Sequence, residues 1–261
     1  MRPVLFSIGD VNLYSYGLMY ALALITGLLW AERRSPRFGL DKNFTFNMGF
    51  GCVVIGVVGA KLLHLLTVID ELKADFWGTL KSSLSEGFVV YGGIIAGVLF
   101  AYIYCRVKKR SFTRHLDMAV APIALGQAIG RVGCFLAGCC YGSQTDSWCA
   151  VTFPAGSHAP AGVPLIPTQP ISALLNLANA VILVIAGRRF KTHGRTGALY
   201  MINYGVGRFL IEFFRNDPRG SIGVLSTSQF ISVGVFVLGV LLMIFAPRLK
   251  VNREEKEEAA G

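Results

Sequence analysis

Charged side chains are scarce in this 261-residue chain, at 15% of its residues, whereas hydrophobic side chains make up 53%. Soluble domains carry about 25% charged residues, so the composition excludes an ordinary soluble fold and indicates a membrane protein. The net charge of +10 would suit nucleic-acid binding, but the basic residues cluster between apolar windows, and we expect no nucleic-acid partner. Low-complexity stretches, repeats and linkers are also missing, so we expect residues 1–261 to form a single domain.

Seven apolar windows are long enough to cross roughly 30 Å of hydrocarbon. They lie near residues 12–31, 44–68, 88–105, 116–138, 170–187, 197–214 and 227–246. Lys and Arg concentrate in four segments that share one side of a seven-span protein, namely 32–42, 106–115, 188–195 and the tail from 247. The positive-inside rule therefore predicts an all-α integral membrane protein with seven transmembrane helices, its N-terminus outside and its C-terminus in the cytoplasm.

A full positive charge, Arg131, stands in the otherwise small and apolar run at 130–142, near the end of the fourth window. A cation in a membrane span is costly unless it meets a partner or a ligand, so Arg131 marks a functional site. The glycines of this run would let a helix or a lipid headgroup approach the backbone. Three of them are candidate structural glycines: Gly130, Gly133 and Gly142.

The sixth window holds a second group of polar residues. Tyr204, Arg208 and Glu212 follow one another at intervals of four, on one stripe of a helix, and Arg215 stays near that stripe. One interpretation is an Arg208–Glu212 pair that neutralises itself and stabilises packing. However, Glu212 alone is too little negative charge for Arg131, Arg208 and Arg215 together. The excess charge favours an anion, and a phospholipid phosphate suits the bidentate fork of arginine.

Three other polar positions lie in the first three windows. Tyr16 is in the first, and Lys61 in the second either extends to the membrane surface or meets a headgroup. In the third, Gly92 and Gly93 indicate close helix packing, which would leave the hydroxyl of Tyr91 facing open space.

Four of the six cysteines fall at or after the outer end of the fourth window: Cys134, Cys139, Cys140 and Cys149. That side is oxidising in many bacteria, so a disulfide that includes Cys149 is one possibility and simple packing is another. The Cys-x4-Cys-Cys spacing is not a usual zinc-ligand pattern, and His158 is the only histidine near it. We therefore expect no metal site.

Several motifs resemble those of the bacterial prolipoprotein diacylglyceryl transferase family. The run GRVGCFLAGCCYG at 130–142 is similar to the family's GRxGNFxNGExxG, and YGVGRFLIEFFR at 204–215 meets every fixed position of YGxxRFxxExxR. Shorter matches are YGLMY at 16–20, GAKL at 59–62, PTQ at 167–169 and the Ser-x-x-Gln at 226–229. The chain departs from the family at Tyr91, commonly His, at Cys134, commonly Asn, and at Cys139, commonly Glu.

The resemblance implies a membrane enzyme of the bacterial inner (plasma) membrane. It would transfer the diacylglyceryl group of phosphatidylglycerol to the lipobox cysteine thiol of a prolipoprotein and release glycerol phosphate, with no cofactor. The implied catalytic residues are Tyr91, Arg208 and Glu212. The implied lipid-phosphate residues are Arg131, Arg208, Arg215, Tyr16, Tyr204 and Lys61.

Alternatives stay open at this point. A paralogous lipid transferase could use another acceptor or a cysteine nucleophile. A membrane thiol oxidoreductase or a transporter could be built around the same polar residues.

Overall fold

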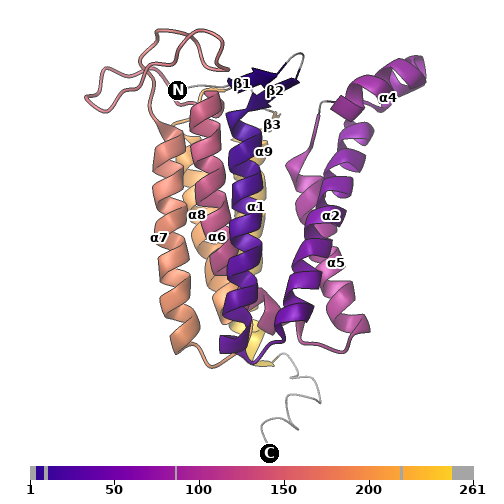
Figure 1. Ribbon diagram of the computed structural model, residues 1–261. Coiled ribbons are helices and arrows are strands. Elements are labelled where there is room, and N and C mark those ends of the chain that lie inside the picture. Colours follow the sequence, from indigo (N-terminus) through magenta and orange to yellow (C-terminus); the bar gives the residue numbers. More distant parts are fainter. Residues whose placement is uncertain (1–3, 9–10, 86, 218–219, 249–261) are drawn as a thin grey trace, which may run out of the picture. The chain divides into compact units, whose positions relative to one another are not determined.

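The computed structural model describes residues 4–8, 11–85, 87–217 and 220–248 (Figure 1). The basic residues of the tail after 248, together with Arg2 and Arg219, lie outside the described residues. Most of what is described is helix.

Seven long helices coincide with the seven apolar windows. They are α1 (Ser15–Arg34), α2 (Lys42–Thr67), α5 (Val90–Val107), α6 (Phe112–Ala137), α7 (Thr168–Arg189), α8 (Arg195–Glu212) and α9 (Thr227–Phe245). Five of these, α2, α5, α6, α7 and α9, are long and apolar enough to cross a membrane. The helix α8 is not in that group, because it contains Arg195, Arg208 and Glu212. The expectation of an all-α, multi-pass membrane protein is thus confirmed in this coarser form.

Short elements lie between and beside the long helices. The strands β1 (Val4–Ile8) and β2 (Val11–Tyr14) pair antiparallel, as do β3 (Ser221–Ile222) and β4 (Leu225–Ser226). Two single turns of 3-10 helix, η1 (Ser35–Phe38) and η2 (Ala246–Arg248), follow α1 and α9. The helices α3 (Ile69–Ala74) and α4 (Phe76–Ser85) were not expected from the sequence; α4 presents Phe76 and Trp77 as exposed aromatic residues.

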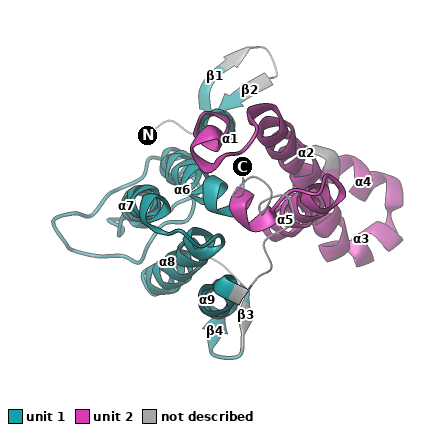
Figure 2. Cartoon of the chain, turned by 90° about the horizontal axis from the view of Figure 1, so that it is seen from below, with its two compact units in different colours: residues 1–30, 116–250 teal, residues 31–115, 251–261 magenta. Residues whose placement is uncertain are grey.

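The chain divides into two compact units (Figure 2). Unit 1 comprises residues 1–30 and 116–250, and unit 2 comprises residues 31–115 and 251–261. The organisation of residues 1–261 as a single functional domain stays a prediction.

In unit 2, α2 and α5 pack closely through glycines. A Cβ atom on Gly92 would overlap the carbonyl oxygen of Gly59 and come within 2.6 Å of Leu63 Cβ, and one on Gly93 would lie 2.9 Å from the carbonyl oxygen of Gly56. Side chains at these positions would push the two helices apart, so glycine permits the contact.

In unit 1, α6 and α7 form the core, and α8 packs against α9. The fully buried core residues are Val120, Ala121, Ala124, Ala180 and Leu183. The carboxylate of Asp117 in α6 accepts hydrogen bonds from the backbone N–H groups of Gly194 (2.6 Å) and Gly197 (2.7 Å) at the start of α8. These N–H groups have no partner within their own helix, so the buried carboxylate joins the first turns of two helices.

Candidate functional site

The opposite ends of these helices meet in unit 1. Just after α6, the carbonyl oxygens of Cys139 and Cys140 accept hydrogen bonds from Gln169 Nε2 (2.8 Å) and Thr168 Oγ1 (2.7 Å) at the start of α7. Further along the same segment, the N–H of Ser143 donates to the carbonyl oxygen of Phe214 (2.9 Å), which lies just after α8. The polar motifs at 130–142, 167–169 and 204–215 therefore come together.

The three glycines proposed for the 130–142 run differ in their surroundings. A Cβ on Gly142 would lie 2.7 Å from the carbonyl oxygen of Ile166 and 2.9 Å from that of Phe214, and one on Gly133 would lie 2.9 Å from Met19 Cβ. At Gly130 a Cβ would meet no described atom within 4 Å. Close packing of protein thus accounts for Gly142 and Gly133, whereas at Gly130 the approach of a lipid headgroup stays a prediction.

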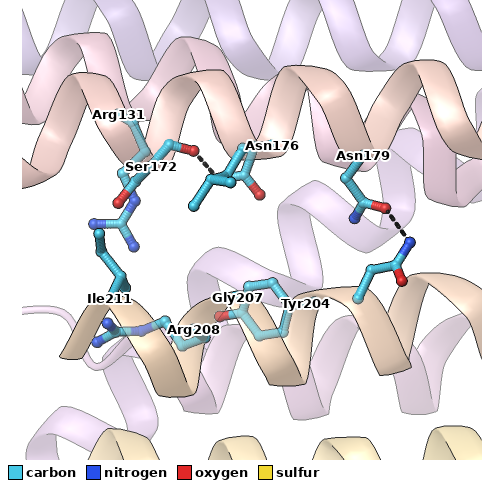
Figure 3. A pocket seen from close by; sticks show the side chains of 10 residues that line it. Arg131, Ser172, Asn176, Asn179, Tyr204, Gly207, Arg208 and Ile211 are labelled. Atoms are coloured by element: carbon cyan, nitrogen blue, oxygen red, sulfur yellow. Dashed lines mark hydrogen bonds between the residues drawn. The ribbon is translucent and has the colours of Figure 1, made fainter. Parts of the chain in front are cut away.

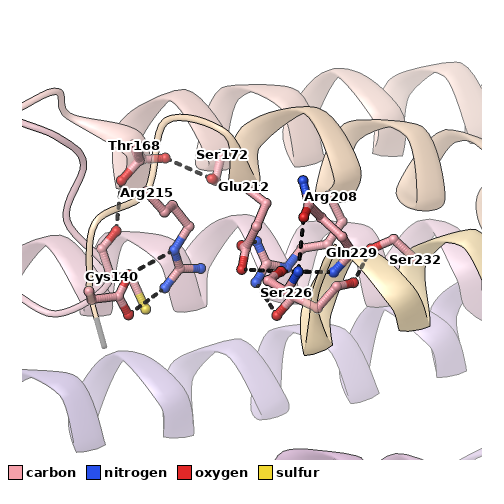
Figure 4. A network of polar contacts seen from close by, with 11 residues as sticks. Cys140, Thr168, Ser172, Arg208, Glu212, Arg215, Ser226, Gln229 and Ser232 are labelled. Carbon is pink, nitrogen blue, oxygen red and sulfur yellow. Dashed lines mark hydrogen bonds and ion pairs between the residues drawn. The ribbon is translucent and has the colours of Figure 1, made fainter. Parts of the chain in front are cut away.

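Arg208 and Glu212 form a buried ion pair within α8. Arg208 Nη1 lies 2.6 Å from Glu212 Oε2, and the two side chains are 10% and 4% exposed. Arg208 Nη2 also donates to Ser228 Oγ (2.8 Å), and Ser226 Oγ donates to Glu212 Oε1 (2.9 Å) (Figure 4). The start of α9 therefore holds both partners of the pair in place.

Arg215 has a carboxylate partner that the sequence analysis did not identify. Its Nε and Nη2 atoms donate to Asp217 Oδ1 and Oδ2, each at 3.1 Å, and the Arg215 side chain is 4% exposed. Burial raises the pKa of the Asp217 carboxyl, and the guanidinium of Arg215 opposes that rise. The spacing of two residues between Arg215 and Asp217 was the signal available, since it lets the two side chains fold back on each other.

A small pocket of about 50 Å³ opens between α6, α7 and α8. Arg131, Tyr204 and Arg208 line it together with Ser172, Leu175, Asn176, Asn179, Asn203, Gly207 and Ile211. Figure 3 shows the guanidinium groups of Arg131 and Arg208 toward one end, and the hydrogen bond between Asn203 Nδ2 and Asn179 Oδ1 (2.9 Å) toward the other. The pocket is thus cationic at one end and neutral but polar at the other.

Arg131 differs from the other two arginines in its partners. Arg208 pairs with Glu212, and Arg215 pairs with Asp217. Arg131 forms no ion pair or hydrogen bond within the described part of the chain. Its half-buried guanidinium therefore carries a positive charge into the pocket wall that no carboxylate among the described residues neutralises.

Tyr16 also belongs to this part of unit 1. Its ring and its carbonyl oxygen lie 3.6 Å from where a Cβ of Gly133 would be, and its ring stacks on Tyr20 with centroids 6.2 Å apart. The hydroxyl of Tyr16 is within electrostatic range of the sulfurs of Cys134, Cys139 and Cys140. The first window therefore contributes an aromatic residue to the end of α6 that carries Arg131.

Tyr91 and Lys61 lie in unit 2. Tyr91 is half-buried in the first turn of α5. The ammonium group of Lys61 donates to the carbonyl oxygens of Ser83 and Gly87 (3.0 Å to the latter) and stands 4.1 Å from the centre of the Phe88 ring. These contacts join α2 to the end of α4 and the start of α5, and a role of either residue toward the lipid stays a prediction.

The cysteines of the described residues are all free thiols. Cys149 is exposed, and its sulfur lies 3.4 Å from Ser147 Oγ. By contrast, the sulfurs of Cys134, Cys139 and Cys140 all lie within 4.8 Å of one another. The disulfide considered for Cys149 is therefore not present here, and the other three cysteines form a cluster.

Apolar helices long enough to cross a membrane, with buried arginines beside a polar pocket, are the features of a multi-pass membrane protein. Comparison with known proteins agrees with this class. Residues 3–245 match the family model described as prolipoprotein diacylglyceryl transferase. The chain belongs to this family.

Two similar proteins from clostridia cover nearly the whole chain. A phosphatidylglycerol–prolipoprotein diacylglyceryl transferase of Clostridium tetani is 40% identical over 242 residues, which are 93% of this chain and 96% of that protein. The protein named phosphatidylglycerol–prolipoprotein diacylglyceryl transferase 2 of Clostridium perfringens is 42% identical over 258 residues, 99% of this chain and 100% of that protein. A transferase of the same name from Finegoldia magna is 31% identical over 257 residues, which are 98% of this chain and all of that protein.

Proposed function

We propose that this protein transfers the diacylglyceryl group of phosphatidylglycerol to the lipobox cysteine thiol of a prolipoprotein and releases glycerol phosphate. The family membership and the names of the similar proteins support this reaction. The structural observation that carries it is Arg131, whose guanidinium lines a pocket within the helical bundle without a carboxylate partner among the described residues. A phosphate diester is the anion that a membrane brings to such a site.

In the reaction the acceptor sulfur attacks the terminal glyceryl carbon. A carbon–sulfur bond forms while the bond from that carbon to the phosphate oxygen breaks, and the electron pair stays on the phosphate. Arg131 and Arg208 would bind this phosphate as its charge grows, with Arg215 behind them. Tyr204 and Tyr16 would complete the phosphate contacts by donating hydrogen bonds, and Lys61 is the candidate from unit 2.

Tyr91 and Glu212 have different proposed roles. Tyr91 carries a phenolic hydroxyl, which can donate a hydrogen bond. Its hydroxyl would then orient the thiolate by donating to it. Glu212 would hold the Arg208 fork toward the pocket, as its 2.6 Å ion pair within α8 indicates. The positive potential of the arginines favours the thiolate, which is the reactive form of the acceptor.

We also propose the full seven-span topology, with α1, α2, α5, α6, α7, α8 and α9 crossing the inner membrane and the N-terminus outside. The contacts within unit 1 support the alternation of its helices. The segment just after α6 meets the start of α7, and the end of α8 meets the start of α9, while Asp117 joins the starts of α6 and α8 at the other end. With the N-terminus outside, as the positive-inside rule favours, Arg131 and Arg208 would lie near the outer leaflet, where prolipoproteins emerge.

The test is Arg131→Lys, which keeps the charge but removes the bidentate fork. Lipidation of a model prolipoprotein in vesicles of phosphatidylglycerol should fall by about 10- to 100-fold, since a hydrogen bond to a charged group contributes about 1.5–3 kcal/mol. The matched control is Arg110→Lys, at an exposed position in the connection between α5 and α6. Near-normal lipidation by Arg131→Lys, at equal membrane insertion, would count against the proposed phosphate site, whereas no lipidation by the wild-type protein would count against the transferase function itself.

A further inference from the structure

Three thiols converge where the polypeptide leaves α6. Cys134 is in the last turns of the helix, Cys139 and Cys140 follow its end, and all three are half-buried. Their sulfur atoms lie within 4.8 Å of one another, and within the described residues they are the one group of His, Cys, Asp and Glu side chains that meets so closely. The reaction proposed above uses none of them.

The backbone that carries these thiols is held from several sides. The N–H of Cys139 donates to the carbonyl oxygen of Cys134 (3.1 Å), and Cys140 adopts a left-handed backbone conformation with φ of 62°. The fully buried Thr168 and Gln169 donate to the two cysteine carbonyl oxygens from α7. A left-handed conformation is costly for a residue with a side chain, and here it turns the Cys140 thiol toward the other two.

The sulfurs lie close enough together to share one metal ion, and two of the three cysteines are poorly placed for a disulfide with each other. Zinc binds thiolate sulfur at about 2.3 Å in a tetrahedron, which places two such sulfurs about 3.8 Å apart. Small side-chain rotations would bring the cluster to that spacing. A disulfide needs its sulfurs about 2.05 Å apart and its Cα atoms usually 4.4 Å or more apart. Cys139 and Cys140 are consecutive, with Cα atoms about 3.8 Å apart, so the pair is too close for an ordinary disulfide.

The charges around the cluster also favour a thiolate complex. The guanidinium groups of Arg131 and Arg215 are within electrostatic range of the sulfurs. Three thiolates around a divalent cation carry one net negative charge, which these arginines stabilise. Arg131 also lines the pocket proposed for the phosphate, so the cluster lies next to the position where the carbon–oxygen bond would break.

We propose that Cys134, Cys139 and Cys140 bind a thiophilic divalent cation such as Zn²⁺, and that the acceptor thiol of the substrate occupies the fourth position. The second part rests on the proposed function. Three protein ligands with one open position are the arrangement of catalytic zinc sites, and a thiol that coordinates the cation is deprotonated. The site would thus supply the thiolate without a dedicated protein base.

The step balances as follows. The acceptor thiol gives its proton to water as its sulfur replaces a water molecule on the cation. The sulfur then forms a bond to the glyceryl carbon, the carbon–oxygen bond to the phosphate breaks, and the electron pair leaves with the phosphate. The resulting thioether is neutral and a weak ligand, so water displaces it and the product dissociates.

The first experiment measures the metal content of the full-length protein in detergent after incubation with Zn²⁺ and removal of free metal. We expect about one Zn²⁺ per chain, lost in the C134S/C139S/C140S variant and retained in Cys149→Ser, which removes the exposed thiol. The proposed site would be wrong if the wild-type protein held no Zn²⁺, or if the triple variant held as much Zn²⁺ as the wild type. A disulfide between any two of the three cysteines in active protein would also overturn the site.

The second experiment uses Co²⁺ as a spectroscopic probe of the same sites. The wild-type protein should show sulfur-to-cobalt charge-transfer absorption, and a lipobox peptide should change the spectrum while its Cys→Ser version does not. A bound Co²⁺ that does not respond to the thiol peptide would overturn the substrate-ligand part.

Activity then separates this inference from the proposed function, using wild-type protein so that folding of a variant is not at issue. Removal of the metal with a chelator should abolish lipidation while the protein stays folded, and Zn²⁺ should restore the activity and raise the unfolding temperature. Full lipidation by metal-free protein would overturn the cation site and leave the transferase function standing. A metal site that responds to the thiol peptide, in a protein without any lipidation activity, would overturn the transferase function and leave the cation site standing.

Discussion

Arg208 and Glu212 approach to 2.6 Å one helical turn apart, and both are almost completely buried. The stripe of α8 that faces the pocket is therefore close to electrically neutral, whereas Arg131 on α6 keeps its charge. This difference decides which substitutions should affect folding and which should affect the reaction.

Glu212→Gln should destabilise the protein by about 3–5 kcal/mol, because it leaves the buried Arg208 without its carboxylate. The double variant Arg208→Met/Glu212→Leu, which replaces the pair by apolar side chains, should unfold closer to the wild-type temperature than Glu212→Gln. Thermal unfolding in detergent measures both. If the single and double variants lowered the unfolding temperature equally, the pair would contribute through its packing and not through its charge.

Gly142→Ala should lower stability by about 1–3 kcal/mol, because its Cβ would lie 2.7 Å and 2.9 Å from the carbonyl oxygens of Ile166 and Phe214. The control is Gly130→Ala, where a Cβ meets no described atom and the helix should gain about 0.5–1 kcal/mol. Unfolding temperatures of the two variants should therefore move in opposite directions. If Gly142→Ala does not lower the unfolding temperature, the segments around Gly142 and Arg215, which form an antiparallel bridge, can separate at little cost.

Asp117→Ala should lower the free energy of unfolding by about 1.5–3 kcal/mol for each charge-assisted hydrogen bond that is lost. Two N–H groups at the start of α8 would lose their acceptor. Asp70→Ala provides the comparison, because the Asp70 side chain is 93% exposed in its ion pair with Lys73 and should change stability by less than about 1 kcal/mol. Similar unfolding temperatures for the two variants would contradict the role of Asp117 as the cap of α8.

Accessibility labelling tests the seven-span topology. Tags in the loops around Lys109 and Arg189, and at the C-terminus, should react only from the cytoplasmic side, and a tag in the connection 143–168 only from outside. If a label added outside intact cells reacted at the Lys109 loop, the proposed orientation would be wrong and Arg131 would lie near the inner leaflet.

The long helices could be predicted from the sequence because hydrophobic windows report directly on the length of a membrane span. Each window agrees with its helix to within a few residues, for example 170–187 against Thr168–Arg189. The helices α3 and α4 were missed because they are short and too polar to stand out as spans. Only a period of about 3.6 residues in the hydrophobicity of 69–85 could have indicated them.

The residues of the proposed site could be named from the sequence, but their partners within the protein could not. A lone Arg in an apolar run is visible in a sequence, whereas the pairing of Arg215 with Asp217 depends on how the chain turns after α8. The thiol cluster was hidden for a similar reason. The Cys-x4-Cys-Cys spacing does not match a familiar ligand pattern, and the sulfurs meet only because the helix ends between Cys134 and Cys139 and Cys140 takes a left-handed backbone.

The hydrogen bond from Ser226 to Glu212 has a consequence for substrate exchange. Ser226 is the N-cap of α9, and its oxygen also accepts from the N–H of Gln229. Glu212 therefore faces both a guanidinium and the positive end of a helix. If Arg208 turns toward an incoming phosphate, the carboxylate still has a hydroxyl and a helix dipole to stabilise it. Under the proposed mechanism, Glu212 would keep Arg208 ordered between turnovers and would release it when the lipid phosphate binds.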